Sequence, residues 1–378
     1  MKYLAVLGRL AGLSAAELTA QFGDSVRRLG KNLALFESIE TPNINRFGGV
    51  LKFGHLLEGD VISYLKNLPE GKITLGISDY SKNASARSAQ REAMKLKKIL
   101  AKAGRSVRVL SNITPDLSTA TSHHNQLGEK PCHVEIMILG REWYISLGTQ
   151  NITAYKNRDQ VRPARDAKVG MLPPKLAQIL INLTGKHEAG ETILDPFCGT
   201  GVVLQEAMLM GYRPYGTDLE PRMIEYSEKN LNWLRDGGAR LSQEFTSEMY
   251  DGEFLVEVGD ATEHRWQQPI NAVACEGYLG QPMSQPPAEI KLKQEKEHCK
   301  EIILGFLKNI HGRIEKGTPL ALAVPAWLRP NGEYERLNIL DEIERMGYNH
   351  EKYLSYKDSL YYRDGQVVAR EIIVLRKK

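Results

Sequence analysis

The sequence of 378 residues has little cysteine and no long hydrophobic run. Its cysteines stand far apart without any C-x-x-C spacing, so neither a zinc site nor a disulfide framework is indicated: Cys132, Cys198, Cys275 and Cys299. No apolar stretch approaches the roughly 20 residues that cross a bilayer. Gly8 and Arg9 interrupt the first apolar stretch before a signal-peptide core can form. We therefore expect a cytoplasmic protein without a metal site or a membrane segment.

The composition is that of a globular protein, with 42% hydrophobic and 25% charged residues. A chain of 378 residues is too long for one ordinary core and predicts two or three domains. The net charge is only +4, but the positive charge is concentrated. Residues 82–108 contain nine Lys or Arg against a single acid, Glu92.

Four regions follow from the pattern along the chain. Residues 1–65 mix short strand-like runs with a helix at "SAAELTAQFG", where Ser14 and Glu17 form a predicted capping box. Residues 66–155 form a second α+β unit, which includes a long helix over about 84–103. Residues 156–173 lose periodicity and are interpreted as a linker. Residues 174–378 form the last domain.

The last domain alternates apolar strand-like and helical segments, which predicts an α/β fold with a parallel sheet covered by helices on both faces. Its final segment, "SLYYRDGQVVAREIIVL", is predicted to be a hairpin that turns at Asp364 and Gly365. We expect this hairpin to place an antiparallel strand at the edge of the sheet.

A ligand site is predicted at "ILDPFCGTG". There a strand runs into Asp195, and a turn with Gly199 and Gly201 opens the next helix, so that bare backbone N–H groups face a ligand. The glycines do not follow G-x-G-x-x-G, and the carboxylate of Asp195 would repel a pyrophosphate but suits an ammonium group. Asp218, 17 residues past Gly201, is placed to accept from ribose hydroxyls, and Asp260 to meet an adenine amine. An amine, a ribose and an adenine together indicate S-adenosylmethionine.

The string "DPFCGTG" resembles motif I of class I methyltransferases that methylate amino groups of RNA or DNA. The resemblance implies a cofactor site made from the following residues: Asp195, Phe197, Cys198, Gly199, Thr200, Gly201, Asp218, Leu219, Asp260, Ala261 and Glu276.

Enzymes of this kind carry (D/N)-P-P-(Y/F) after the fourth strand, where the first residue holds the acceptor amine and the aromatic ring stacks on the flipped base. This sequence departs from the motif with "NAVACEGYLGQP". One alignment puts Glu276 at the acid position, with Gly277 and Tyr278 in the proline places; the other puts Tyr278 at the aromatic position and Cys275 first. We prefer the first. The predicted catalytic residues are Glu276 and Tyr278.

The long helix of the second region carries a basic stripe, because five of its cations fall within an arc of about 80° on a helical projection. They are Arg87, Arg91, Lys95, Lys98 and Lys102. Small and apolar residues, Ala89, Ala93, Leu96, Leu100 and Ala103, occupy the opposite arc. A solvated face is the alternative explanation. The stripe has no acidic partners at i+4, and the methyltransferase motif follows in the same chain, so phosphate binding is favoured.

The whole chain resembles the THUMP-domain tRNA guanine-N2 methyltransferases found in archaea and eukaryotes. "YLAVLGRLAGLSAAEL" is similar to their ferredoxin-like N-terminal domain, and "LGISDY", the basic helix and "DLSTATSHHNQL" to the THUMP RNA-binding domain. "NRDQVRPARDAKVGMLPPKLAQILINL" is similar to the linker and first methyltransferase helix. The implied last domain is a Rossmann-like class I methyltransferase with a mostly parallel seven-stranded sheet and an antiparallel terminal hairpin.

The same resemblance implies tRNA as the partner, docked by its acceptor end on the THUMP domain. Further RNA contacts are expected from Ser118, Thr119, His123, Asn125 and Arg162. The leading hypothesis is methyl transfer to guanine N2. The alternatives are a catalytically silent RNA-binding protein that keeps the cofactor fold, and an adenine-N6 methyltransferase acting on rRNA or DNA. Some eukaryotic relatives need a small activating subunit, which leaves room for one here; the methylated position, the number of methyl groups and the oligomeric state stay open.

Overall fold

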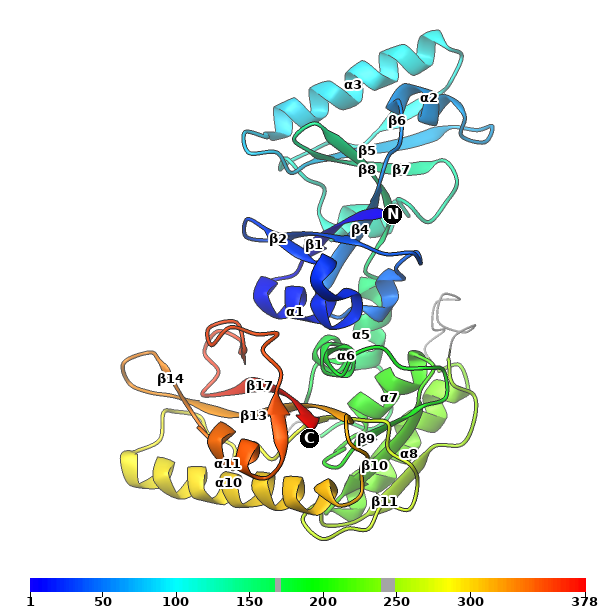
Figure 1. Cartoon of the computed structure of the whole chain (residues 1–378). Helices are drawn as coiled ribbons and strands as arrows, with labels where there is room; N and C mark the ends of the chain where they lie inside the picture. Colours follow the sequence, from blue (N-terminus) through cyan, green and yellow to red (C-terminus); the bar gives the residue numbers. More distant parts are fainter. Residues whose placement is uncertain (167–170, 239–248) are drawn as a thin grey trace. The chain divides into compact units, whose positions relative to one another are not determined.

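The computed structural model describes residues 1–166, 171–238 and 249–378. They form two compact units (Figure 1). The first unit comprises Met1–Ala15, Phe22–Asn45 and Gly49–Thr153, and the second comprises Ala16–Gln21, Arg46–Gly48 and Ala154–Lys378. The predicted boundary after residue 65 lies inside the first unit, whose sheet takes strands from both sides of it. The division of this unit into two domains stays a prediction.

The first unit is built on one eight-stranded mixed sheet. In spatial order its strands are β2 (Arg27–Leu29), β3 (Leu33–Glu37), β1 (Lys2–Leu7), β4 (Val50–Leu56), β8 (Glu142–Thr149), β7 (His133–Leu139), β5 (Ile73–Asp79) and β6 (Val107–Val109). The pairs of β5 with β6 and with β7 are parallel, and the other pairs are antiparallel. The antiparallel pair of β4 and β8 makes the sheet continuous.

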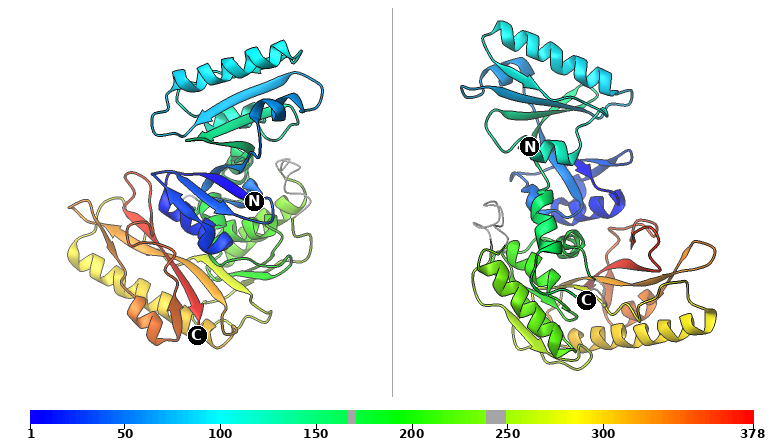
Figure 2. Two further views of the ribbon diagram at one scale, coloured as in Figure 1. Left: turned by 45° about the horizontal axis from the view of Figure 1, so that its top comes forward. Right: turned by 180° about the vertical axis from the view of Figure 1, so that it is seen from behind.

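The long basic helix predicted from the sequence is α3 (Ala86–Lys102), which lies along β5 and β6 (Figure 2). Its inner face buries Ala89, Ala93, Leu96 and Leu100 as predicted, whereas Ala103 caps the helix and is exposed. The other helices are α1 (Ala11–Phe22), α2 (Val61–Lys66) and α4 (Thr119–His124), with short 3-10 turns at Gly23–Ser25 and Ile44–Arg46.

The capping box predicted for α1 is wrong because the helix begins three residues before Ser14, at Ala11. Ser14 therefore lies inside the helix, where its hydroxyl donates to the carbonyl of Leu10 at 3.1 Å. Glu17 is fully buried and accepts hydrogen bonds from the backbone N–H of Gly48 at 2.9 Å and the side-chain amide of Asn182 at 2.8 Å. These donors satisfy the carboxylate that was assigned to the cap.

The second unit is built on a nine-stranded sheet. Its main path runs β11 (Leu255–Val258), β10 (Arg213–Asp218), β9 (Thr192–Asp195), β12 (Ala272–Glu276), β13 (Pro319–Leu328), β17 (Val368–Lys377) and β15 (Tyr348–His350). The first five are mutually parallel, and β17 is antiparallel to both of its neighbours. Two short strands lie off this path: β14 (Tyr334–Arg336) pairs with β13, and β16 (Leu360–Tyr361) pairs with β17.

Helices cover both faces of this second sheet, as the strand–helix alternation predicted. The helices are α5 (Ile152–Gln160), α6 (Pro174–Leu183), α7 (Val202–Leu209), α8 (Pro221–Arg235), α10 (Glu289–His311) and α11 (Leu340–Arg345). The side chains of Val273, Cys275 and Leu322 pack with Ile303 and Phe306 of α10. Since side chains alternate along a strand, Ala272, Ala274 and Glu276 face the other way, where α6 contacts β12 and β13.

Two sequence predictions need correction here. The terminal hairpin exists, with β16 and β17 joined through a turn at Gly365 (φ +78°), but β17 does not lie at the sheet edge. It is inserted between β13 and β15, and its residues 369–375 are buried on both faces. The predicted linker 156–173 begins inside α5, whose Arg158 is buried against Glu206 at 2.7 Å. Among the described residues, no helix is long and apolar enough to cross a membrane.

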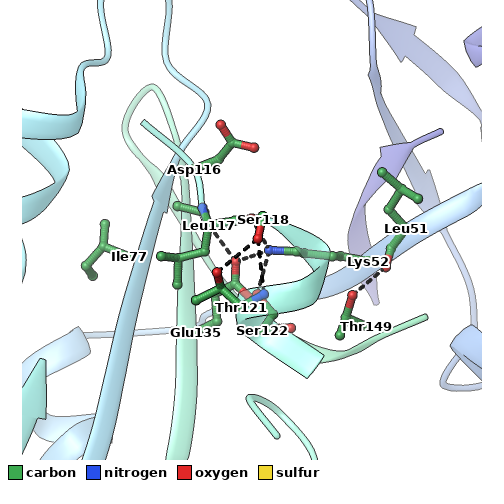
Figure 3. Close-up of polar contacts among 12 residues, drawn as sticks. Leu51, Lys52, Ile77, Asp116, Leu117, Ser118, Thr121, Ser122, Glu135 and Thr149 are labelled. Carbon is green, nitrogen blue, oxygen red and sulfur yellow. Dashed lines mark hydrogen bonds and ion pairs between the residues drawn. The ribbon is translucent and has the colours of Figure 1, made fainter. Parts of the chain in front are cut away.

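A buried charge cluster ties the sheet of the first unit to α4 (Figure 3). The ammonium of Lys52 on β4 lies 2.6 Å from Glu135 on β7, and the two side chains are 2% and 0% exposed. Lys52 also donates to the carbonyl of Leu117 at 2.7 Å and to the hydroxyl of Ser122 at 2.8 Å. Glu135 accepts from the hydroxyls of Ser78 and Ser122. The bonds to Leu117 and Ser122 hold the 117–122 segment against the sheet.

We predict that Lys52→Met lowers the free energy of unfolding by about 3–5 kcal/mol, because it leaves the Glu135 carboxylate buried without its partner charge. The matched control is Lys95→Met, since Lys95 is 64% exposed in its pair with Glu92 and should change stability by less than about 0.5 kcal/mol. Urea denaturation measures both. A loss below about 1 kcal/mol for Lys52→Met would contradict the buried-pair argument.

Candidate active site

Four carboxylates lie at one edge of the second sheet, because each follows the carboxyl end of a parallel strand. Asp195 ends β9, Asp218 ends β10 and Glu276 ends β12, while Asp260 comes two residues after β11. These four strands are neighbours in the order β11-β10-β9-β12. The carboxyl edge of an open parallel sheet is where such folds bind ligands.

The turn after β9 requires glycine at two positions. Gly199 has φ +52° and Gly201 has φ +75°, in the left-handed region that side chains disfavour. A Cβ on Gly201 would lie 2.8 Å from the hydroxyl oxygen of Ser227, whereas one on Gly199 would meet nothing within 4 Å. The turn is fixed by the Gly199 N–H donating to Asp218 at 2.8 Å and by the Ser227 hydroxyl donating to the Gly199 carbonyl at 2.8 Å.

The electrostatics of this edge favour a cation. Asp195 is 2% exposed and accepts from the backbone N–H of Phe197 at 3.1 Å. Burial raises the pKa of Asp195 well above its ordinary value, and the nearby charges of Asp218 and Glu276 raise it further. Burial also raises the pKa of Asp218. A positively charged ligand group would relieve this repulsion.

Apolar side chains flank the carboxylates. Leu219, next to Asp218, is 64% exposed, and Val258, two residues before Asp260, is 52% exposed. They offer a surface for a flat ring beside two hydrogen-bond acceptors. Leu219 was predicted from the sequence, whereas Val258 was missed, although it stands in the quoted strand end "VGDAT".

The remaining predicted cofactor residues make packing contacts and hydrogen bonds in and around the turn. Phe197 contacts Phe306 edge to face at 5.5 Å between ring centres. Cys198 is buried against Leu204, its backbone N–H donates to Thr217, and burial raises the pKa of its thiol well above the ordinary value. Thr200 holds the side chain of Asn230 through its carbonyl at 2.9 Å. Ala261 is buried in the core beneath Asp260.

Glu276 pairs with a residue that sequence reasoning missed. One of its carboxylate oxygens accepts a hydrogen bond from Nε of Arg370 on β17. The arginine side chain is 6% exposed and that of Glu276 is 20% exposed. A signal existed in the sequence, because Arg370 interrupts the apolar run of "VVAREIIVL".

The departure from the expected motif has a backbone consequence. The N–H of Gly277 donates to the carbonyl of Ala323 on β13 at 2.9 Å, a bond that a proline at this position could not make. Cys275 is fully buried in the core on the α10 side, which favours the alignment with Glu276 in the acid position. Tyr278 is half-buried, contacts the ring of His298 edge to face at 5.4 Å, and its hydroxyl accepts from Gln281 at 3.3 Å. Its role as stacking platform stays a prediction.

The residues predicted to bind RNA fall into three groups. All five cations of the α3 stripe are exposed. In α4 the hydroxyl of Ser118 caps the helix by accepting from the Thr121 N–H at 3.1 Å, and the side chain of Asn125 closes it through the Thr121 carbonyl at 2.9 Å. Thr119 is half-buried, and His123 lies 3.3 Å from the Thr153 hydroxyl.

Arg162 differs from the expectation because it is only 2% exposed, and burial lowers the pKa of its guanidinium. The reason is that its segment packs against α8, where Asn230 bonds both the N–H and the carbonyl of Ala164. The structure therefore does not place Arg162 on a surface that RNA reaches.

Comparison with known proteins finds similarity to methyltransferases. The family model described as UPF0020, RMKL-like, methyltransferase domain, matches residues 162–244. The chain is 29% identical over 202 residues to a tRNA (guanine(10)-N2)-dimethyltransferase of Methanothermobacter thermautotrophicus, covering 53% of each chain. It is 26% identical over 272 residues to a protein of the same name from Pyrococcus abyssi, covering 70% of this chain and 72% of that one. The first of these relatives is thus matched over about half of its length.

A solved structure, TrmN from Thermus thermophilus, aligns over 100% of both chains with 18% identity and a TM-score of 0.45. The second unit has a mainly parallel sheet with a glycine turn after β9, and the methyltransferase-domain family model matches residues 162–244 within it. In sequence, the chain is similar to two proteins named tRNA (guanine(10)-N2)-dimethyltransferase.

We predict that Gly201→Ala lowers the free energy of unfolding by about 1–2 kcal/mol from the left-handed backbone and about 1–3 kcal/mol more from the clash with Ser227. Gly199→Ala is the matched control, because it carries the backbone cost without the clash. Urea denaturation of the two variants separates the contributions. Equal losses would show that Ser227 moves away without cost.

Proposed function

We propose that the protein is an S-adenosylmethionine-dependent tRNA methyltransferase that transfers a methyl group to the exocyclic N2 amine of a guanosine. The observation that carries the proposal is the edge of four carboxylates around a glycine turn in a class I methyltransferase fold. The printed names of the relatives in Methanothermobacter and Pyrococcus support the choice of tRNA and of guanine N2.

The residues present fit the cofactor. Asp195 is a buried carboxylate that needs a cation, and the ammonium of a methionine moiety meets that need. Asp218 and Asp260 accept from the ribose hydroxyls and the adenine amine, between the exposed side chains of Leu219 and Val258. When bound, S-adenosylmethionine would supply a methyl group from its positively charged sulfur to N2, and the proton released from N2 would pass to solvent.

On the acceptor side, Glu276 holds the amine and Tyr278 carries the flipped base. The lone pair of a guanine amine is delocalised into the ring, so its alignment with the methyl group is the main task of the protein. A carboxylate only accepts hydrogen bonds. Glu276 can therefore orient one N–H of the amine while the other face of the nitrogen stays open to the methyl group.

The first unit would dock the tRNA. The stripe of Arg87, Arg91, Lys95, Lys98 and Lys102 presents exposed cations along α3, and the α4 segment with Ser118, Thr119, His123 and Asn125 is held by the Lys52 cluster. Phosphate contacts of this kind give affinity and register without reading bases. In this scheme the THUMP-like unit fixes the position of the target and the methyltransferase unit performs the transfer.

The alternative is a silent RNA-binding protein, which the Gly277–Ala323 bond favours because it replaces the proline geometry of the expected motif. Retention of Asp195, Asp218 and Asp260 favours the enzyme.

The deciding assay supplies labelled S-adenosylmethionine and an unmodified tRNA pool, followed by nucleoside digestion and mass spectrometry. We expect labelled N2-methylguanosine. Asp195→Asn should weaken cofactor affinity by about tenfold or more in calorimetry, since it removes a charge–charge contact. The exposed Asp236→Asn is the control and should bind normally. Labelled N6-methyladenosine, or no labelled nucleoside although cofactor and tRNA both bind, would refute the proposal.

For docking, we predict that the triple variant Arg91→Ala, Lys98→Ala and Lys102→Ala weakens tRNA binding about tenfold. The slope of log affinity against log salt should fall by about 0.7–0.9 for each phosphate that the variant no longer neutralises. A triple variant of exposed α10 lysines, Lys291→Ala, Lys293→Ala and Lys308→Ala, removes the same charge and serves as control. Equal weakening by both sets would mean that net charge, and not the stripe, binds tRNA.

A further inference from the structure

The ion pair between Glu276 and Arg370 reaches across a strand. β13 separates β12 from β17, and in the sheet register Glu276 stands beside Ala323, which stands beside Ile372. Arg370 is two residues from Ile372 and pairs with Pro325, on the same face and nearer the carboxyl end of β13. The small side chains of Ala323 and Pro325 leave room for the two long ones to meet at the carboxyl edge.

A single hydrogen bond joins the pair. Only Nε of Arg370 and one oxygen of Glu276 are engaged, and among the described residues no other side-chain hydrogen bond reaches either group. The two terminal nitrogens of the guanidinium and the second carboxylate oxygen therefore keep their donors and acceptors free for a ligand.

A neighbouring pair shows what a closed arrangement looks like. Glu371 follows Arg370 and so points to the opposite face of β17, where it meets Arg336 on β14 at 2.5 Å. That guanidinium also donates to the hydroxyl of Ser359 at 2.7 Å and to the carbonyl of Tyr356. The guanidinium of Arg336 thus donates hydrogen bonds from more than one nitrogen and links β14 to the C-terminal segment, whereas that of Arg370 donates from one nitrogen only.

We propose that Arg370 and Glu276 together read the Watson–Crick edge of the guanine acceptor, an inference that rests on the proposed guanine-N2 activity. Guanine presents two donors, N1–H and N2–H, beside one acceptor, O6. The carboxylate of Glu276 accepts from N1–H and N2–H, and a terminal nitrogen of Arg370 donates to O6. Such edge reading of a flipped base by hydrogen bonds is a general mode of recognition.

The same pair rejects adenine. The N1 atom of adenine is an acceptor, so it would face the oxygens of Glu276 with no hydrogen between them, and its N6 amine would face the donors of Arg370. Unpaired polar groups of this kind discriminate strongly between substrates. Arg370 is accordingly a specificity-determining residue and Glu276 its partner.

The test is a double-substitution cycle, in which one change is made in the protein and the other in the substrate base. In a synthetic tRNA the guanosine mapped by the methylation assay is replaced by 6-thioguanosine, which keeps N1–H and the N2 amine but turns O6 into a weak acceptor. For the wild-type protein, kcat/KM should fall about tenfold or more with sulfur. Arg370→Met should lose a similar factor on guanosine and no more than about twofold further on 6-thioguanosine.

Arg336→Met is the matched control, because it removes a buried, paired guanidinium from the neighbouring strand and should keep the tenfold discrimination. Arg370→Lys retains the charge without the planar fork and should fall between wild type and Arg370→Met. The wild-type comparison of the two tRNAs needs no variant and so stands even if Arg370→Met does not fold.

The outcomes separate the two proposals. If the wild-type protein methylates guanosine but tolerates sulfur, or if sulfur and Arg370→Met act as independent factors, the edge-reading inference is overturned and the proposed function stands. If the wild-type protein methylates no guanosine, both are overturned. Dependence of each effect on the other establishes the contact between Arg370 and O6.

Discussion

The repulsion among four carboxylates at one sheet edge is the constraint on which the rest of the second unit depends. Parallel strands bring Asp195, Asp218, Asp260 and Glu276 to the same edge although all four carry like charge. Burial raises the pKa of Asp195, and the nearby charges of Asp218 and Glu276 raise it further. Two of these carboxylates have a positive partner. The glycine turn aims a backbone N–H at Asp218, Arg370 takes one oxygen of Glu276, and Asp195 keeps the largest imbalance. That imbalance is the part a cationic cofactor would neutralise.

The backbone makes this arrangement possible at two places where a side chain or a proline would prevent it. At Gly201 the positive φ and the contact with Ser227 exclude a Cβ, so the turn approaches α8 closely enough for Ser227 to bind the Gly199 carbonyl. At Gly277 a free N–H continues the pairing with β13 and keeps Glu276 level with Ala323. A flexible residue in place of the motif's proline therefore does not loosen the strand end, because the sheet holds it instead.

The sequence predicted those features of the site that depend on neighbours along the chain, and it failed where neighbours come from elsewhere. Asp195 with its glycines, Asp218 and the inner face of α3 follow from local spacing, and the structure places them as expected. The pairing of Arg370 with Glu276 could not be predicted, because the two residues lie 94 positions apart and meet only through the strand order β12-β13-β17. The prediction that β17 lies at the sheet edge was wrong for the same reason, because the sequence does not reveal the strand order. Ser14 and Glu17 matched a capping pattern, but donors from Gly48 and Asn182, distant in sequence, decided the role of Glu17.

Each unit contains an ion pair that spans an intervening strand, and the difference between them carries the functional argument. Lys52 and Glu135 cross β8, and four further hydrogen bonds close the cluster. The free-energy cost of removing two charges from water is rarely offset by their mutual attraction alone. A buried pair without such bonds therefore contributes little to stability. Arg370 and Glu276 form that second kind, since one bond joins them and the remaining donors and acceptors have no side-chain partner among the described residues. A buried arginine with a single hydrogen bond adds little to the stability of the fold. A substrate base with the complementary pattern of donors and acceptors supplies the hydrogen bonds that are missing.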